Sequence, residues 1–410
     1  MIKSEADLTY LFENDLDVIN QIDETPFYFF SERVLRRNWE IVFNSFKSQW
    51  KNIAIAYSFK TNSLIGVCRI MNDFGAWSEV TSDHELNIAR IINAKNILFN
   101  GIYKTKDEMI DAIHMGVSIN LDGWSQLDTL VEIASLIEEE IKIGIRLTPG
   151  PKIDSSWDKF GFEYHTLDKI LQKIRVHPNI HLIGLHAHIG SNIKRTKSYY
   201  EVAYFLGTIS NYLAEKQKIE LTYIDLGGGF PSFLTENNFV KYAESIVGGL
   251  RKSKINQDVL VIIEPGRSLV ETTGVLISRV IDIRRRASKN SRYLILDAGV
   301  NLAMGVDLTG SRTILCGQKL NNATLNKYDV FGPLCAQRDI LAENLRLPQL
   351  RKGDIVYIPN IGAYDISTAY PFIRLRPPVY LKKTDGQIVL LRRGEQSEDV
   401  FLLERDLPLN

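Results

Sequence analysis

The sequence predicts an α/β protein: a TIM-like (β/α)8 barrel followed by a smaller β domain. Two observations predict the barrel. Eight apolar runs of strand length recur between residues 53 and 264, and amphipathic segments of helical length separate them. Alternating strands and helices imply a parallel sheet. Eight such units in roughly 210 residues fit a closed barrel better than an open sheet.

The expected barrel strands follow one another at regular intervals. They are residues 53–59, 76–80, 96–100, 117–121, 141–147, 182–186, 222–226 and 259–264. The second of them, AWSEV, is a weak strand signal, so its assignment depends on the rhythm of its neighbours. Segments such as SQLDTLVEIASLIEEE fill the intervals and have the periodicity of amphipathic helices.

A change of rhythm after about residue 270 predicts the second domain. Segments such as TGVLISRVIDIRRR and QIVLLRR are short, β-rich and separated by Gly, Pro, Asn and Asp, which is typical of an antiparallel β domain. TPFYFF at 25–30 is also strand-like, and we expect it to pair into that domain. The predicted boundaries are therefore 31–272 for the barrel, and 1–30 with 273–410 for a discontinuous β domain.

Composition excludes several classes of function. The chain has 410 residues, with 49 Lys plus Arg and 49 Asp plus Glu, and this zero net charge gives no support for nucleic-acid or acidic-membrane binding. No stretch has the apolar length of a membrane span, and the acidic N-terminus does not resemble a targeting signal. Cys68, Cys316 and Cys335 have no metal-binding spacing. A cytoplasmic setting fits these features.

Lys60 comes directly after the first expected strand, in AYSFKTNS. Chemistry in a (β/α)8 barrel lies at the C-terminal ends of the strands, so this lysine is expected at the barrel mouth. A lone lysine at this place could equally be a surface residue. Its interpretation therefore depends on the residues at the ends of the other strands.

The sixth strand leads into GLHAHIGSN. His186 and His188 are two residues apart and are expected on one side of the strand, where they could be metal ligands. No third ligand is placed close by in sequence, so we predict no metal. Gly190 and Ser191 offer a flexible backbone and a hydroxyl, which suit an oxyanion.

The seventh and eighth strands lead into DLGGGFP and EPGRSL. The first contains Gly227, Gly228 and Gly229, which let backbone N–H groups approach an anion closely. In the second, Glu264 could form a structural ion pair with Arg267. A glycine-rich loop after strand seven and a Gly–Arg pair after strand eight also form the usual phosphate site of such barrels.

These parts together point to one cofactor. Pyridoxal 5′-phosphate (PLP) forms a Schiff base with a lysine, pairs its pyridine nitrogen with an acid and binds its phosphate through several donors. Lys60, Glu264 and the phosphate cradle supply this set.

Several motifs resemble the fold-type III PLP decarboxylases, the alanine-racemase-like barrels that include diaminopimelate and ornithine decarboxylases. The resemblance covers almost the whole chain. It includes TPFYFFSERVLRRN, YSFKTNS, EVTSDHEL, ILFNG, DKFGF, GLHAHIGSN, DLGGGFP, EPGRSLV, LDAG, GPLCAQRD, GDIVYIPNIGAY and LLRRGEQSEDV.

This resemblance implies a role for each candidate residue. Lys60 forms the Schiff base, His188 stacks on the cofactor ring, and Glu264 pairs with the pyridine nitrogen. Cys335, in GPLC, is the acid that protonates the product and comes from the partner subunit of a homodimer with shared active sites. The implied phosphate ligands are Ser191, Gly227, Gly228, Gly229, Gly266, Arg267 and Tyr364.

Two departures from the family concern the substrate. Ala336 follows the cysteine where diaminopimelate decarboxylases have Glu and ornithine decarboxylases have Asp, and both of those carboxylates read a distal ammonium. The segment VNLAMGVDLTGSR also lacks the Arg–Pro–x–x–Tyr motif, whose Arg binds the distal carboxylate of diaminopimelate. Because both devices for recognising charge are missing, we expect a different substrate.

The GPLC motif is similar to that of secondary-metabolism decarboxylases, which act on carrier-protein-linked or conjugated amino acids. We therefore expect decarboxylation of an amino acid or amino-acid conjugate, with Arg338 or Arg312 reading a distal group. Ala336 and Asp339 complete the expected substrate region. The alternatives are a diaminopimelate decarboxylase with diverged specificity residues, an amino-acid racemase, and a non-catalytic PLP-binding regulator.

Overall fold

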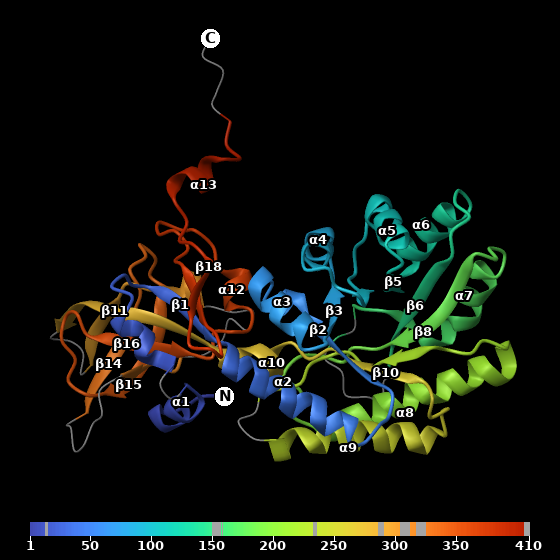
Figure 1. Ribbon diagram of the computed structural model, residues 1–410, viewed down its shortest axis with the longest axis horizontal. Helices are drawn as coiled ribbons and strands as arrows, with labels where there is room; N and C mark the ends of the chain where they lie inside the picture. The colour runs from blue at the N-terminus through green and yellow to red at the C-terminus, as the bar shows by residue number, and fades with distance from the viewer. Residues whose placement is uncertain are drawn as a thin grey trace, which may run out of the picture. The chain divides into compact units, whose positions relative to one another are not determined.

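The computed structural model describes residues 1–12, 15–149, 157, 159–232, 236–285, 291–303, 312–316 and 325–405. The chain divides into two compact units (Figure 1). The barrel unit comprises residues 37–269, and the β unit comprises residues 1–36 with 270–410.

The barrel unit is a closed ring of eight parallel strands. In ring order they are β2 (Ile53–Ser58), β3 (Trp77–Val80), β4 (Ile97–Phe99), β5 (Ser118–Leu121), β6 (Ile141–Thr148), β8 (Ile180–His186), β9 (Tyr223–Asp225) and β10 (Leu260–Ile263). Pairing of β10 with β2 closes the ring. A two-residue strand, β7 (Phe162–Glu163), adds to β6. All eight predicted strands are confirmed, including the weak second one.

Helices follow most of the barrel strands in the chain. They are α2 (Glu32–Lys47), which leads into the barrel, α3 (Ile65–Asp73), α4 (Asp83–Ile91), α5 (Lys106–His114), α6 (Trp124–Ala134), α7 (Leu167–Ile174), α8 (Thr196–Tyr212), α9 (Glu236–Ser253) and the short α10 (Arg267–Val270). Figure 1 shows α8 and α9 running side by side. Local sequence defines where α5 begins, because Thr105 and Glu108 form a capping box there.

One tyrosine ring belongs to the apolar core of the barrel. Tyr223 is buried there, with Ala54, Ala56, Leu98 and Ile262 in the same apolar cluster. Glycines on the neighbouring strands leave the space that the tyrosine needs. A Cβ at Gly184 would lie 2.0 Å from Tyr223 Cζ, and one at Gly144 would lie 2.3 Å from its hydroxyl oxygen.

The β unit is a mixed sheet. Its strands are β1 (Phe27–Ser31), β11 (Gly274–Arg285), β12 (Arg292–Leu296), β13 (Leu315–Cys316), β14 (Asn326–Phe331), β15 (Ile340–Leu347), β16 (Ile355–Pro359), β17 (Val379–Lys382) and β18 (Ile388–Arg392). Short helices accompany them: α1 (Glu5–Phe12), α11 (Val300–Ala303), α12 (Asp365–Thr368) and α13 (Ser397–Phe401).

The N-terminal strand joins this sheet, as the sequence predicts. β1 pairs antiparallel with β11 and parallel with β17. β12 and β14 also pair in parallel, so the sheet is not antiparallel throughout. The side chains of β1 are all buried, which explains why TPFYFF reads as an apolar strand.

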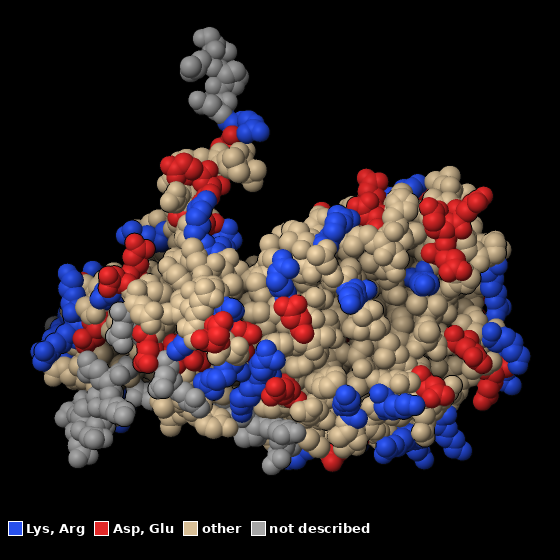
Figure 2. Space-filling view, viewed as in Figure 1, with Lys and Arg blue, Asp and Glu red and all other residues tan. Residues whose placement is uncertain are grey.

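The described part of the chain has no helix that is both long and apolar enough to cross a membrane. On the face drawn in Figure 2, acidic and basic side chains are interspersed. This mixed surface agrees with the zero net charge of the chain.

Candidate active site

A cavity of about 530 Å³ lies within the barrel unit and is lined by residues from the C-terminal ends of its strands. Lys60 follows β2, Glu79 lies in β3, Asn100 follows β4 and Glu264 follows β10. The lining also includes Thr81, Ser82, Asp83, Gly101, Ile102, Tyr103, Glu108, Arg146, Trp157, Phe160, His186 and His188. The strand-end rule therefore places Lys60 and Glu264 at one cavity, as the sequence predicts.

Lys60 forms an ion pair with Glu79, whose side chain is fully buried. The carboxylate of Glu79 also accepts hydrogen bonds from the hydroxyl of Ser58 and, at 3.1 Å, from Nδ2 of Asn100. Burial disfavours the charged form of both groups, but the opposite charges and the hydrogen bonds around them together have the larger effect on both pKa values. Glu79 and Glu264 hold the pKa of Lys60 above its usual value, and Lys60 with the hydrogen-bond donors holds the pKa of Glu79 below its usual value.

Glu264 is a buried carboxyl group in which one of the two oxygens makes no hydrogen bond among the described residues. Oε1 accepts a hydrogen bond from Nδ2 of Asn100 at 2.5 Å. Oε2 is buried, makes no hydrogen bond in the described part of the chain, and lies 3.7 Å from Nε2 of His186. Burial, together with the charge of Glu79, raises the pKa of Glu264 to about 7. A buried oxygen without a partner is costly and suits a group that receives a ligand N–H.

The glycine-rich loop lies against the turns that follow the two neighbouring strands. Gly227 and Gly229 have φ values of +64° and +89°, which favour glycine. A Cβ at Gly228 would lie 2.3 Å from the carbonyl oxygen of Glu264, and one at Gly229 would lie 2.4 Å from that of Gly190. Any larger residue would push the loop away from these turns.

The loop also presents unused donors. Among the described residues, the backbone N–H groups of Gly228 and Gly229 have no hydrogen-bond acceptor, and Ser191 is exposed on the adjoining turn. Gly266 is equally constrained, since a Cβ there would lie 2.0 Å from Oγ1 of Thr61. Arg267 begins α10 directly after it. This is the arrangement expected of a cradle for a phosphate group.

The two histidines of the sixth strand have different surroundings. β8 ends at His186, which is buried, and His188 lies in the turn beyond it. Burial lowers the pKa of both imidazoles well below the usual range. His186, Asp225 and Glu264 are buried together, with one nitrogen or oxygen atom of each within 4.8 Å of the others. The absence of a metal stays a prediction. The ring of His188 packs against Trp157 at 4.9 Å between centroids.

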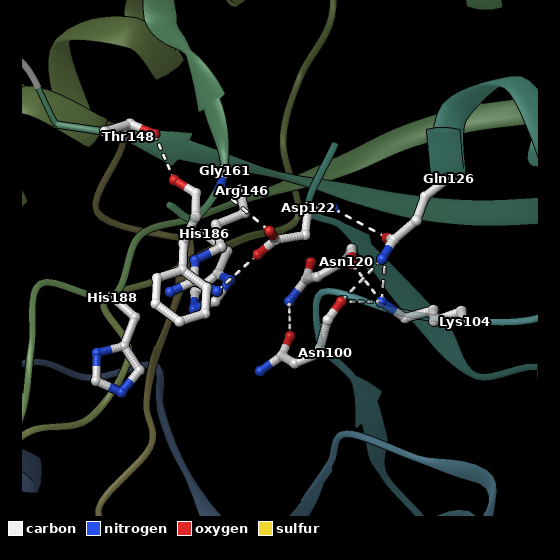
Figure 3. A network of polar contacts seen from close by, with 12 residues as sticks. Asn100, Lys104, Asn120, Asp122, Gln126, Arg146, Thr148, Gly161, His186 and His188 are labelled. Carbon is white, nitrogen blue, oxygen red and sulfur yellow. Dashed lines mark hydrogen bonds and ion pairs between the residues drawn. The ribbon is translucent and has the colours of Figure 1, made fainter. Parts of the chain in front are cut away.

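Arg146 forms another part of the cavity wall. Its guanidinium donates to Oδ1 of Asp122 at 2.6 Å and lies 4.4 Å from the centre of the Phe160 ring. Oδ2 of Asp122 accepts from the backbone N–H of Gly161 at 3.2 Å. Figure 3 shows this network between His188 and the Asn120 side chain. The arginine is therefore fixed on one side by charge and on the other by an aromatic ring.

A buried lysine supports the loop at the cavity edge. Nζ of Lys104 donates to the carbonyl oxygens of Gly101 and Asn120 at 2.8 and 3.0 Å and to Oε1 of Gln126 at 3.3 Å (Figure 3). Burial lowers the pKa of Lys104 to about 7. Three acceptors around one amine hold this loop to β5 and α6.

The other candidate residues belong to the β unit. Cys335, Ala336 and Arg338 are exposed on the turn that follows β14. Asp339 ends this turn and is buried, and its carboxylate accepts from the backbone N–H groups of Val300 and Leu334, both at 2.8 Å. Asp339 therefore holds the shape of the turn that presents Cys335.

The remaining two lie near α12. Arg312 forms an ion pair at 2.5 Å with Asp365, which is buried. Tyr364 has a φ of +71°, which is unusual for a residue other than glycine, and immediately precedes α12. Such strain often accompanies a functional position.

Glu79, Asn100 and Arg146 are site residues that the sequence reasoning missed. A signal was present in each case, because each is a polar residue in or directly after an apolar barrel strand. It is the signal that identified Lys60 and Glu264. Reading all eight strand ends for polar side chains would have found them.

Comparison with known proteins agrees with this geometry. Residues 36–271 match the family model of the pyridoxal-binding domain of pyridoxal-dependent decarboxylases. A probable chloroplastic diaminopimelate decarboxylase of Oryza sativa is 27% identical over 93% of this chain and 80% of its own length. The diaminopimelate decarboxylase of Archaeoglobus fulgidus is 28% identical over 83% of each chain.

Solved structures show the same likeness. A diaminopimelate decarboxylase structure from Methanocaldococcus jannaschii superimposes with a TM-score of 0.86 at 26% identity, covering 96% of this chain and 94% of that one. A Helicobacter pylori diaminopimelate decarboxylase in complex with L-lysine superimposes with a TM-score of 0.84 at 25% identity, covering 95% of this chain and 98% of that one.

Proposed function

Because the chain belongs to the pyridoxal-dependent decarboxylases, and is therefore a PLP-dependent amino-acid decarboxylase, we propose that it removes a carboxylate from meso-diaminopimelate. One observation carries the assignment of the site. A single barrel cavity collects an accessible lysine amine, a buried acid with an unpartnered oxygen and a wall of aromatic rings, and the glycine cradle lies beside its Glu264 wall.

The residues present fit the cofactor. Lys60 is 35% exposed and lines the cavity, so its amine is accessible to the aldehyde. Oε2 of Glu264 suits the pyridine N–H, and the free N–H groups of Gly228 and Gly229 suit the phosphate. Ser191, Gly227, Gly266, Arg267 and Tyr364 are the further phosphate ligands in this proposal.

The bound cofactor supplies a ring that accepts the electron pair left behind when carbon dioxide departs. The protein has three tasks around that step. Glu264 would hold a proton at the pyridine nitrogen, His188 would contact the ring, and Glu79 would hold the amine of Lys60 in the cavity. Lys60 or Cys335 then donates the proton that replaces the carboxylate.

The relatives support diaminopimelate as the substrate. The first relatives found are diaminopimelate decarboxylases from a plant, archaea and bacteria, and they match this chain over most of their length. The Helicobacter structure with L-lysine supports L-lysine as the product. Arg312 is held by Asp365, which leaves exposed Arg338 as the better candidate for reading a distal carboxylate.

A conjugated amino acid, free or carrier-linked, is the second candidate substrate. The observation that favours it is Ala336, which offers no charge where relatives of this type are expected to read a distal ammonium. An uncharged, exposed position beside Cys335 accommodates a substrate whose far end is neutral or extends into solvent. We also propose that the active form is a homodimer to which Cys335 comes from the partner subunit.

The lysine assignment predicts where the cofactor attaches. After borohydride reduction and digestion, the phosphopyridoxyl mass should be found on the peptide that contains Lys60 and not on the peptide that contains Lys104, which is buried outside the cavity lining. Lys60→Ala should lose the visible absorbance of the bound cofactor and at least about 10³-fold in kcat. Label on another lysine would refute the assignment.

The substrate assignment is tested by carbon dioxide release. Release from meso-diaminopimelate at an ordinary turnover, and not from ornithine or arginine, is expected. Arg338→Ala should then raise KM for diaminopimelate about tenfold or more, as expected for loss of a charged contact. Turnover only with a conjugated or carrier-linked amino acid would instead establish the second candidate.

A further inference from the structure

Asn100 connects the two carboxylates of the site. Its Nδ2 donates to Oε1 of Glu79 at 3.1 Å and to Oε1 of Glu264 at 2.5 Å. The three side chains come from the ends of β4, β3 and β10, and Asn100 itself is only 5% exposed. One amide nitrogen therefore bridges the acid that holds Lys60 and the acid proposed for the pyridine nitrogen.

A second amide determines which way Asn100 faces. Oδ1 of Asn100 accepts from Nδ2 of Asn120 at 2.7 Å (Figure 3). Oδ1 of Asn120 in turn accepts from the hydroxyl of Tyr223 at 2.6 Å. A hydroxyl can donate only one proton, and each amide has separate donor and acceptor ends. The chain from Tyr223 to Asn120 to Asn100 is therefore directional, and it ends with the donor of Asn100 at the carboxylates.

The opposite orientation is unfavourable. Flipping Asn100 would place its oxygen against two acidic groups and its NH2 against the NH2 of Asn120. Each lost buried hydrogen bond leaves a polar group without a partner, and a donor to a charged group contributes more than a donor to a neutral group. All three members of the chain are buried, with exposed fractions of 5% for Asn100, 1% for Asn120 and 3% for Tyr223.

We propose that Asn100 is a positioning residue that links the Lys60–Glu79 ion pair to Glu264, and that Tyr223 and Asn120 orient its amide for this task. The inference rests on the roles proposed above for Lys60 and Glu264. Asn100 lines the cavity, and in this role it acts through its two partners by favouring the ionised form of both carboxylates.

The charge balance around Glu264 shows why this donor matters. Groups that titrate or carry charge face it from several elements: Lys60, Glu79, His186, Tyr223 and Asp225. Lys60 is the single cation among them, and burial keeps His186 neutral. Removing the Asn100 donor leaves three carboxyl groups, those of Glu79, Asp225 and Glu264, beside one cation, so Glu79 or Glu264 should bind a proton more readily.

The test uses Asn100→Leu and Asn100→Asp in the full-length enzyme. The control is Asn52→Leu, since Asn52 precedes β2 and donates to the carbonyl oxygen of Asp258 at 2.9 Å, far along the strand from the cavity-lining end. The holoenzyme readout is the pH midpoint of the visible cofactor absorbance and the rate of cofactor release on dilution. The Asn100 variants should shift the midpoint upward by about one pH unit or more and release cofactor about tenfold faster.

The apoenzyme gives a readout that needs no cofactor. A carboxyl whose pKa is raised on folding lowers stability as pH rises from its unfolded to its folded pKa. For Glu264 this decline in Tm should end near pH 7 in the parent protein, and in the Asn100 variants it should continue to higher pH. Tyr223→Phe keeps the buried ring. It should raise both the pH midpoint of the cofactor absorbance and the pH at which the decline in Tm ends, each by less than the Asn100 variants do.

Each outcome bears on one proposal. Asn100 variants that fold, with absorbance midpoint, release rate and apoenzyme profile equal to those of Asn52→Leu, overturn the role of Asn100 while leaving the function intact. If the Asn100 variants do not fold, Tyr223→Phe is compared with Asn52→Leu in their place, and equal readouts in those two variants overturn the role of Asn100. If the parent protein does not attach PLP to Lys60, the proposed function fails, and the apoenzyme profile still tests the link between the carboxylates.

Discussion

At the scale of single residues, the Lys60–Glu79 ion pair decides how the site behaves. Glu79 is completely buried and has three partners, whereas Lys60 is about one third exposed. Removing one member of such a pair leaves the charge of the other without a partner, which lowers the free energy of unfolding. The loss is smaller when the remaining group is partly exposed to solvent, as Lys60 is. The pair therefore stabilises the protein and holds the amine in the cavity at the same time.

Glu79→Gln should destabilise the protein by about 2 kcal/mol at pH 7, measured by urea unfolding. The depressed pKa of Glu79 makes its contribution complete above the ordinary value of 4.5 and lost as pH falls. The raised pKa of Lys60 makes its contribution complete below the ordinary value of 10.5 and lost as pH rises. The difference in free energy of unfolding between Glu79→Gln and the parent protein should thus be largest between pH 4.5 and pH 10.5.

The control is Glu132→Gln, which breaks the exposed ion pair between Glu132 and Lys106 at 3.9 Å. Exposed pairs of this kind contribute about 0–1 kcal/mol, so this variant should unfold close to the parent. Equal losses in the two variants, or a loss in Glu79→Gln that does not change with pH, would contradict the account of the pair.

At the scale of elements, the turns after β8, β9 and β10 hold one another in place. The backbone N–H of Glu264 donates to the carbonyl oxygen of Gly227 at 2.9 Å, and that of Ile193 donates to Gly229 at 2.9 Å. The hydroxyl of Tyr199 donates to the carbonyl oxygen of Gly228 at the same distance. These bonds use the carbonyl groups of the loop. The backbone N–H of Gly227 donates to Oδ1 of Asp225 at 2.9 Å, so the N–H groups left for an anion are those of Gly228 and Gly229.

Gly229→Ala compared with Gly75→Ala separates this packing from backbone strain. Both glycines have a positive φ, +89° and +97°, but a Cβ at Gly75 meets nothing within 4 Å. Each variant should lose roughly 1–2 kcal/mol through the left-handed conformation. Gly229→Ala should in addition lose at least about tenfold in PLP affinity, since its loop must move away from Gly190.

Equilibrium dialysis with PLP, together with urea unfolding, measures both quantities. Gly75 lies at the end of α3 and away from the cavity lining, so the PLP affinity of that variant should be unchanged. Equal PLP affinities in the two variants would show that the loop does not form the phosphate cradle.

At the scale of the whole molecule, the chain combines a barrel that carries Lys60 with a β unit that carries Cys335. The proposal that Cys335 acts in the partner's site makes activity a property of the dimer. In a symmetric dimer each subunit then contributes to both sites.

Mixing inactive variants tests this arrangement. Lys60→Ala and Cys335→Ala should each be inactive as pure dimers. When equal amounts are refolded together or exchange subunits, half of the dimers should contain one subunit of each variant, and each of these has one intact site. The mixture should therefore recover about one quarter of the parent kcat. Recovery should require subunit exchange, which native mass spectrometry can follow. An exchanged but inactive mixture would place Lys60 and Cys335 of the same subunit in one site.

Much of the fold and part of the site could be predicted from the sequence. The alternation of apolar runs with amphipathic segments predicts all eight barrel strands, because a closed parallel barrel buries every strand and surrounds it with helices. TPFYFF is predicted as a strand because it is an apolar run of strand length, and β1 is buried throughout in the β unit. The predicted domain boundaries, 31–272 for the barrel, stay a prediction beside the observed unit of 37–269.

The chemical character of the chain was thus determined by sequence: a lysine, an acid and a glycine-rich loop, each directly after an apolar strand. Which side chains these groups meet was decided only by the tertiary structure. Glu79, Asn100 and Glu264 converge because β2 pairs with both β3 and β10 when the barrel closes, and β3 pairs with β4. Local periodicity reports only which residues of a segment are buried, whereas contacts between segments depend on strand order, register and closure.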